Sequence, residues 1–341
     1  MKIGLVGYSC CTGLGEVNRQ IATYCNIHSW LIYPHRSRQT HLYHDISCMK
    51  AVVADHHDTQ EEVRQFVKDV DVIVFVETPY YNSLLQMAKQ YGKRVVCIPM
   101  QEWMPVDNQL QTAWTKYVDL FICPIRYTYE LFKDKLPCIN FSWPYEVNRF
   151  KFKHRSRCNR FLFINGGGGH RGRKGADVIE KALQIDPKLP ITIYSQDPRM
   201  VSRLGSLDSL PNVIYKGEAA TNEEMYEDGD VLLCPHHIDG LCLEPREAAA
   251  VGMPTLVTAG GPWEDLDCVS ETIPATVHPH MFKRPVKWYE PNPQELVKLC
   301  NRLIDAPIGD KSSICRISAE NRCWDWMAQE FVSLVTQGVA S

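Results

Sequence analysis

The sequence predicts an α/β protein of two domains, each built on a parallel β-sheet with helices on both faces. Its 341 residues are enough for about two domains. Short runs of Val, Ile, Leu and Phe alternate with helical patterns along most of the chain. Strands that are apolar throughout are typical of parallel sheets buried on both faces. The alternation pauses once, at residues 144–159, which divides the chain into two parts of similar length.

The apolar runs give the expected strands in two series. The first series comprises residues 2–6, 31–33, 72–76, 94–98 and 120–123. The second series comprises residues 160–164, 191–194, 213–215, 231–234 and 255–258. Helices are expected between several of them, as at residues 61–67 and 83–91. The last expected helix, residues 318–336, is amphipathic with Trp324, Met327 and Phe331 on one face.

These patterns set the expected domain boundaries. The pause in the alternation is rich in Lys and Arg and lacks an apolar period, which is typical of a linker. We therefore predict a first domain at 1–148, a linker at 149–159, a second domain at 160–317 and a C-terminal helix at 318–341. Phe150 and Phe152 stand beside this basic segment, and they either stack on nucleic-acid bases or, as is more typical, pack the hinge.

Composition and charge exclude several classes of protein. Hydrophobic residues make up 45% and charged residues 23%, which fits a globular protein and excludes a disordered chain, a collagen or a coiled coil. A net charge of −3 gives no global attraction to nucleic acid or membrane, although local basic loops leave a peripheral contact with either open. No apolar run approaches the roughly 18 residues of a membrane-spanning helix. The 14 cysteines form no Cys-x-x-Cys pair and often lie in apolar runs, which favours reduced thiols and a cytoplasmic protein.

The first candidate site is the glycine pair that follows the first expected strand. Gly13 and Gly15 let the backbone approach a ligand, and the helix that follows favours an anion at its N-terminus. The spacing is not the Gly-x-Gly-x-x-Gly fingerprint of a dinucleotide site. A plain tight turn explains this loop equally well.

The second candidate site is the string Gly166 to Gly175, GGGGHRGRKG, which follows the strand at 160–164. Gly167 and Gly168 stand inside it, and Arg171, Arg173 and Lys174 precede a helix. Backbone N–H groups, the helix dipole and basic side chains together favour a diphosphate. No Ser or Thr follows Lys174, so this is not a Walker loop with a magnesium ligand. A surface loop without a ligand is the alternative.

The third candidate site begins after the strand at 231–234 and contains two acids eight positions apart, Asp239 and Glu247. Pro245 suits the first turn of a short buried helix, so Glu247 lies in that turn. Both acids could accept hydrogen bonds from ligand hydroxyls. Alternatively, Glu247 caps its helix by accepting from the Glu244 backbone N–H.

In these residues the chain resembles the retaining glycosyltransferases of family 4, which have two Rossmann-like domains facing a cleft, the GT-B architecture. The matching residues are Asp239-Gly240-Leu241-Cys242 with Glu247, then Gly252-Met253-Pro254, Gly260-Gly261-Pro262, Lys174-Gly175, and Glu16 after Gly13 and Gly15. The helix that contains Trp324 also matches, and in the family this helix returns to the first domain. The family has Glu where this chain has Asp239. The resemblance spans most of the chain and is specific from residue 160 to residue 262.

The resemblance implies a role for each matching residue. Lys174, with Arg171 or Arg173, would bind the diphosphate and stabilise the leaving group. Glu247 would bind the ribose, and Asp239 the donor sugar together with the N–H groups of Leu241 and Cys242. The glycines at 13, 15, 167, 168, 260 and 261 would line the donor site. Transfer of a hexose or pentose would proceed with retention, with a nucleotide sugar as co-substrate and no other cofactor, and without a protein nucleophile or a metal ion.

The sequence gives fewer indications of which residues bind the acceptor. Glu77 and Glu102, which end two strands of the first domain, are the polar candidates there. Arg36 and Arg38 follow the second strand and suggest an anionic acceptor, such as a phosphate-bearing lipid, glycan or nucleic acid. Exposed charge for solubility explains this basic loop equally well. An epimerase or phosphorylase of the same fold, and a non-catalytic protein that binds a nucleotide sugar, are the alternative functions.

Overall fold

A computed structural model describes residues 1–33, 50–53, 60–79, 82–166, 172–196, 204–263, 266 and 269–338. The chain divides into two compact units. Unit 1 comprises Met1–Trp143, Met281–Val286 and Asp325–Ser341, and unit 2 comprises Pro144–His280 and Lys287–Trp324. The domain boundaries given above remain predictions. Among the described residues, no helix is both long and apolar enough to cross a membrane.

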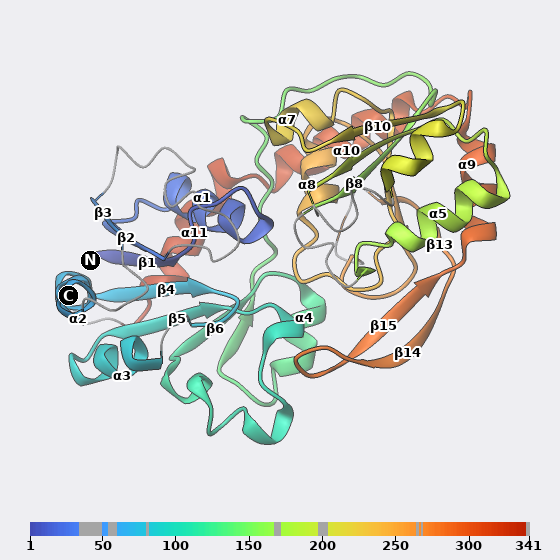
Figure 1. Cartoon of the computed structure of the whole chain (residues 1–341). Helices are drawn as coiled ribbons and strands as arrows, with labels where there is room; N and C mark the ends of the chain where they lie inside the picture. The colour runs from blue at the N-terminus through green and yellow to red at the C-terminus, as the bar shows by residue number, and fades with distance from the viewer. Residues whose placement is uncertain are drawn as a thin grey trace. The chain divides into compact units, whose positions relative to one another are not determined.

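Unit 1 contains a seven-stranded parallel sheet with the order β3-β2-β1-β4-β5-β6-β7 (Figure 1). Its strands are β1 (Ile3–Gly7), β2 (Ser29–Ile32), β3 (Lys50–Val53), β4 (Val72–Val76), β5 (Arg94–Ile98), β6 (Leu120–Cys123) and β7 (Cys138–Asn140). Its helices are α1 (Gly13–Tyr24), α2 (Gln60–Asp69), α3 (Asn82–Gln90), α4 (Arg126–Phe132) and α11 (Trp324–Thr336). Figure 1 shows α1 and α11 on one side of this sheet and α2 and α3 on the other. Every residue of β1 and β4 is buried, as expected for strands covered on both faces.

Unit 2 contains a six-stranded parallel sheet with the order β10-β9-β8-β11-β12-β13. Its strands are β8 (Phe161–Asn165), β9 (Ile191–Ser195), β10 (Val213–Gly217), β11 (Val231–Cys234), β12 (Thr255–Thr258) and β13 (Val269–Ile273). Its helices are α5 (Ala176–Ile185), α7 (Asn222–Met225), α8 (Leu243–Ala250), α9 (Pro293–Leu303) and α10 (Gly309–Asn321). A separate two-stranded sheet joins β14 (Ala275–Met281) and β15 (Pro285–Pro291).

The predicted fold class is confirmed, because two parallel α/β sheets are present and each predicted strand has a counterpart in them. Both sheets reverse their strand order once, between β1 and β4 in the first and between β8 and β11 in the second. At such a switch point the loops after the two central strands diverge to opposite faces and leave a crevice for a ligand. The glycine string follows β8 and the Asp239 loop follows β11, so both emerge at the switch point of the second sheet.

One arginine of the basic segment at 149–159 is buried in unit 2. Arg155 is 2% exposed. Its guanidinium donates to the backbone carbonyls of Gly229, Lys153, Val251 and Tyr226 at 2.7–3.1 Å. Burial lowers the pKa of Arg155 to about 10, so the group still carries its charge at neutral pH.

The two phenylalanines of the same segment both pack within unit 2. Phe150 is fully buried in the core of unit 2. The Phe152 ring lies 2.4 Å from the position that a Cβ on Gly252 would take, so the absence of a side chain there lets the ring pack on the backbone. Phe150 is therefore not available for stacking on a base, whereas Phe152 is 40% exposed.

Replacing Arg155 by Met should destabilise the protein by roughly 3 kcal/mol, because the three buried carbonyls of Gly229, Val251 and Tyr226 would lose their donors at about 1 kcal/mol each. The matched control is Arg157→Met, since Arg157 makes one exposed hydrogen bond, to the Asp305 carbonyl at 2.8 Å. Urea unfolding of both variants measures the difference. Equal stability of the two variants would show that the buried guanidinium does not hold this segment.

Candidate functional site

The N-terminus of α5 lies directly against the loop that follows β11. Gly175 precedes α5 with φ +78°, and a Cβ at this position would lie 1.9 Å from the Pro235 carbonyl oxygen. Only glycine tolerates both that close approach and that backbone conformation. The His237 backbone N–H also donates to the Arg173 carbonyl at 2.8 Å. The basic end of the glycine string and the acidic loop are thereby held side by side.

Lys174 is the centre of a buried cluster of charges. Its Nζ atom lies 2.6 Å from Oδ2 of Asp239 and 2.7 Å from Oε1 of Glu244. Burial alone would lower the pKa of Lys174, but the two carboxylates outweigh burial and raise it. Burial raises the pKa of Asp239, yet Lys174 and His236 hold it well below its usual value. The amine and the Asp239 carboxyl are therefore both ionised at neutral pH.

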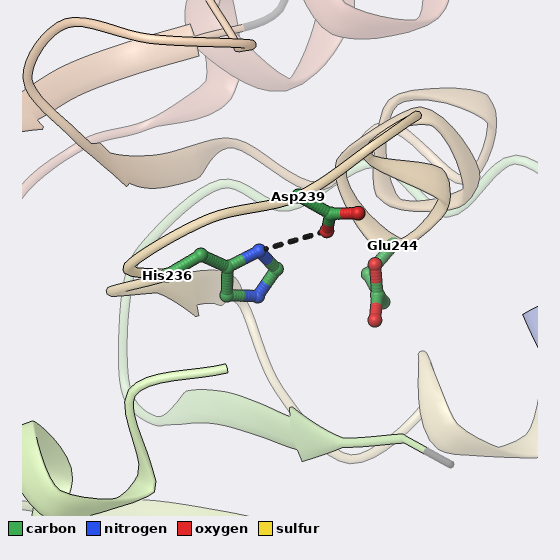
Figure 2. Close-up of side chains that lie close together, drawn as sticks. All are labelled: His236, Asp239 and Glu244. Carbon is green, nitrogen blue, oxygen red and sulfur yellow. Dashed lines mark ion pairs between the residues drawn. The ribbon is translucent and has the colours of Figure 1, made fainter. Parts of the chain in front are cut away.

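His236 completes this cluster from the same loop as Asp239. Its Nδ1 atom lies 3.1 Å from Asp239 Oδ2, and Figure 2 shows the ring turned toward that carboxylate with Glu244 beside it. Burial, together with the charge of Lys174, lowers the pKa of His236, so the imidazole is neutral at pH 7. His236 thus lies beside Asp239, which the motif resemblance assigns to the donor sugar.

The same three side chains are a candidate metal site by geometry. One ligand atom from each of His236, Asp239 and Glu244 lies within 4.8 Å of the others. The Lys174 ammonium, however, already lies within 2.7 Å of both carboxylates. A divalent cation would have to displace this amine. The donor set fits a lysine counter-ion better than it fits a metal.

The sequence contains three Asp-x-Asp triplets, at 69–71, 228–230 and 265–267, and the acids that the structure describes have structural partners. Asp69 pairs with Lys50 at 2.5 Å, and Asp71 accepts from the Lys2 backbone N–H at 2.8 Å. Asp228 accepts from the Tyr194 hydroxyl, and Asp230 accepts from the backbone N–H groups of Asn159 and Arg160. The third triplet, at 265–267, falls on residues whose acids lie outside the described part of the chain.

Glu247 is buried in α8 and is bound by side chains from the segment around α7. Its Oε2 atom accepts from the Tyr226 hydroxyl at 2.6 Å, and its Oε1 atom accepts from the Asn222 side-chain amide at 3.3 Å. Burial and then the Glu247 charge raise the pKa of Tyr226 well above its usual value, so this hydroxyl keeps the proton that it donates. The Glu247 carboxylate is therefore oriented by the side chains of Tyr226 and Asn222, whereas the helix-cap interpretation had named the backbone N–H of Glu244 as its donor.

His237 ties the same loop to α5 and to β15. Its Nδ1 atom lies 2.7 Å from the Tyr289 carbonyl oxygen, and its Nε2 atom lies 2.9 Å from Oδ1 of Asp177. The ring thus connects its own loop to both of these elements. The imidazole also stacks on Trp288 with ring centroids 4.6 Å apart. His237 is therefore a positioning residue for the loop that carries Asp239.

The structure describes four more of the predicted residues of unit 2, namely Leu241, Cys242, Gly260 and Gly261. Leu241 and Cys242 are buried at the start of α8, where Cys242 has φ +61°. Gly260 and Gly261, with φ +77° and +84°, pack against the Tyr289 ring. Gly167, Gly168 and Arg171 lie outside the described residues.

In unit 1 the structure gives structural roles to some of the predicted residues. A Cβ on Gly15 would lie 1.9 Å from the Cys10 carbonyl oxygen, which is what the tight-turn interpretation requires. Gly13 begins α1. Glu77 ends β4 with φ +72°, and Glu102 is buried in a single turn after β5. Arg36 and Arg38 lie outside the described residues.

Sequence reasoning did not identify Glu244, Tyr226 or Asn222 as site residues. Glu244 precedes Glu247 by three positions in the first turn of α8, and that spacing on one helix face was the signal available. No sequence pattern pointed to Tyr226 or Asn222, because only folding brings the segment around α7 next to Glu247.

Comparison with known proteins identifies the fold. No family model matches the sequence, and no curated protein is significantly similar to it. Similar solved structures include a sucrose-phosphate synthase from Thermosynechococcus elongatus, with 13% identity, TM-score 0.66, and coverage of 99% of this chain and 98% of that one. They also include HepE from Anabaena in complex with UDP, with 13% identity, TM-score 0.68, and coverage of 98% and 100%.

A third similar structure is a glycosyltransferase from Rickettsia africae, with 10% identity, TM-score 0.67, and coverage of 98% of each chain. The likeness extends over the whole length of all three proteins. The chain therefore has the GT-B fold of these glycosyltransferases, as its sequence motifs predicted. Family 4 membership and retention remain predictions.

Replacing Asp177 by Asn should make the folding stability of the protein depend less on pH. Burial opposes ionisation, but the hydrogen bond from His237 and the charges of His237 and Lys181 lower the pKa of Asp177. A lowered pKa stabilises the fold above the unfolded value of about 4, and that stability is lost as the pH falls through the folded value. The stability difference between wild type and Asp177→Asn should therefore shrink between about pH 5 and pH 2.

Urea unfolding at several pH values measures this difference. Asp310→Asn, in the first turn of α10, is the matched control. A difference that is constant down to pH 2 would contradict the assigned ion pair.

Proposed function

We propose that the protein is a glycosyltransferase that moves a hexose or pentose from a nucleotide sugar to an acceptor, with the donor bound by unit 2. The observation that carries the proposal is the position of Lys174, a buried ammonium at the switch point, between the glycine string and the Asp239 loop. The shared fold supports it, and the structures of HepE hold UDP and UDP-glucose. The motif resemblance supports the same assignment from the sequence.

The residues of the cluster have distinct roles in this proposal. Lys174 and Arg173 bind the diphosphate and stabilise the charge that develops on it as the sugar departs. Asp239 accepts hydrogen bonds from sugar hydroxyls, and the backbone N–H groups of Leu241 and Cys242 donate to the same donor. Glu247, held by Tyr226 and Asn222, accepts from the ribose hydroxyls. Transfer proceeds with retention and without a protein nucleophile in this proposal, so the acceptor oxygen bonds to the anomeric carbon from the same face on which the bond to the diphosphate breaks.

We further propose that this chemistry needs no divalent metal. The Lys174 ammonium provides the positive charge that a metal would bring to the diphosphate. It also interacts with two of the three candidate metal ligands.

Acceptor binding is assigned to unit 1. Glu77 and Glu102 follow neighbouring parallel strands at their carboxyl ends, which is where ligands bind in such sheets. An anionic acceptor is supported only by the sequence of Arg36 and Arg38. The cytoplasmic location likewise rests on the sequence alone.

Replacing Lys174 by Gln should weaken the binding of a nucleotide sugar roughly 10- to 100-fold, because a charge-assisted hydrogen bond to phosphate is lost. Thermal shifts with UDP-, GDP- and ADP-sugars identify the donor in the wild type, since a bound ligand raises the apparent stability. Calorimetry then compares the variants.

Lys298→Gln is the control, because Lys298 is an exposed lysine of the same unit that pairs with Glu295 at 2.7 Å. Wild-type affinity of a folded Lys174→Gln protein would remove Lys174 from the donor site. If no nucleotide sugar stabilises the wild type, the proposed function fails.

Transfer activity should survive treatment with EDTA, because in this proposal Lys174 and the α5 N-terminus stabilise the negative charge of the diphosphate. The measurement is turnover of the identified donor in EDTA and after addition of Mg²⁺ or Mn²⁺. Activity that EDTA abolishes and either ion restores would assign a metal to this site.

A further inference from the structure

Glu244 lies where an anionic ligand of Lys174 would bind. Its Oε1 atom is 2.7 Å from the Lys174 Nζ atom. The same oxygen lies 3.6 Å from the position that a Cβ on Gly166 would take, at the start of the glycine string. A carboxylate oxygen therefore fills the space between the ammonium and this backbone. The proposed function places a diphosphate oxygen in that space.

The charges around Lys174 leave it no free positive charge. Asp239 and Glu244 both pair with it, and the three side chains are only 6%, 9% and 14% exposed. One ammonium between two carboxylates has a net charge of −1, and the lowered pKa of His236 means that its ring adds no charge. Arg173 is the further positive group whose charge acts on Lys174 and Asp239. A diphosphate that approaches Lys174 would meet the Glu244 carboxylate as a like charge at short range.

The two carboxylates are not held alike. Asp239 Oδ1 also accepts from the Gly240 backbone N–H at 2.8 Å, so its own loop fixes its direction. Glu244 has one more methylene group and is the more exposed of the two. A Cβ on Gly166 would lie 3.6 Å from the Glu244 Oε1 atom and 3.9 Å from the Gln196 Oε1 atom, so the glycine itself does not crowd the Glu244 carboxylate. Glu244 is therefore the partner that can leave Lys174.

We propose that Glu244 is an internal competitor for the diphosphate site, and that its carboxylate leaves Lys174 when the nucleotide binds. This inference rests on the proposed function and deepens it by naming a residue that sets the affinity for the donor. Because Glu244 pairs with Lys174, the affinity for the donor stays below the value that the site would reach without Glu244. Loss of the competing charge strengthens the binding of diphosphates and leaves the binding of uncharged nucleosides as it was.

The test is a calorimetric titration with pyrophosphate, UDP and uridine. Glu244→Gln keeps the shape of the side chain and removes its charge. It should bind pyrophosphate and UDP about tenfold more tightly than the wild type does, a difference of about 1.4 kcal/mol. Its affinity for uridine, which has no phosphate, should be that of the wild type. Glu244→Ala is a second variant that should show the same gain if the Gln variant folds poorly.

Glu227→Gln is the matched control, because it also removes one negative charge from unit 2. Glu227 is exposed and pairs with Lys153 at 3.1 Å. A gain of equal size in this control would overturn the proposal, as would unchanged or weaker pyrophosphate binding in both Glu244 variants. If Lys174→Gln weakens binding while the Glu244 variants show no gain, only the competition is wrong. If the wild type and the Glu244 variants all fail to bind pyrophosphate and UDP, the proposed function fails as well.

Discussion

The candidate site depends on one buried ammonium that is shared by two carboxylates. Burying a charge is expensive unless it is paired, and a broken buried pair leaves a charge that nothing compensates. Lys174, Asp239 and Glu244 meet this condition together, because each carboxylate lies within 2.7 Å of the amine. The rest of the cluster follows from this constraint. His236 is kept neutral beside it, and His237 holds the loop that presents Asp239.

The parallel sheet of unit 2 brings these groups together although Lys174 and Asp239 are 65 residues apart. The reversal of strand order between β8 and β11 makes the loops after these strands neighbours. Gly175 then allows α5 to approach the Pro235 carbonyl, which no residue with a Cβ could do without displacing the backbone. The proposed site for a nucleotide diphosphate is thus formed by two loops and a helix N-terminus. None of these elements would bind an anion strongly by itself.

The sequence predicted the parts of the fold whose patterns are local. The central strands are buried on both faces, so they appear as apolar runs, whereas β14 is exposed along most of its length and reads as a loop. Lys174, Asp239 and Glu247 were identified because glycines, prolines and acids mark them in the sequence. Glu244 and Tyr226 were missed, since only the folded chain shows what they contact. The burial of Arg155 was not predicted either, because a buried guanidinium and an exposed one look alike in a sequence.

The most direct test of the account is a crystal structure of the protein with the nucleotide sugar that stabilises it most. The account predicts a diphosphate oxygen within hydrogen-bond distance of the Lys174 Nζ atom and the ribose hydroxyls on Glu247. It also predicts that the Glu244 carboxylate has moved away from Lys174. A nucleotide bound elsewhere, with Lys174 still held between Asp239 and Glu244, would contradict the account.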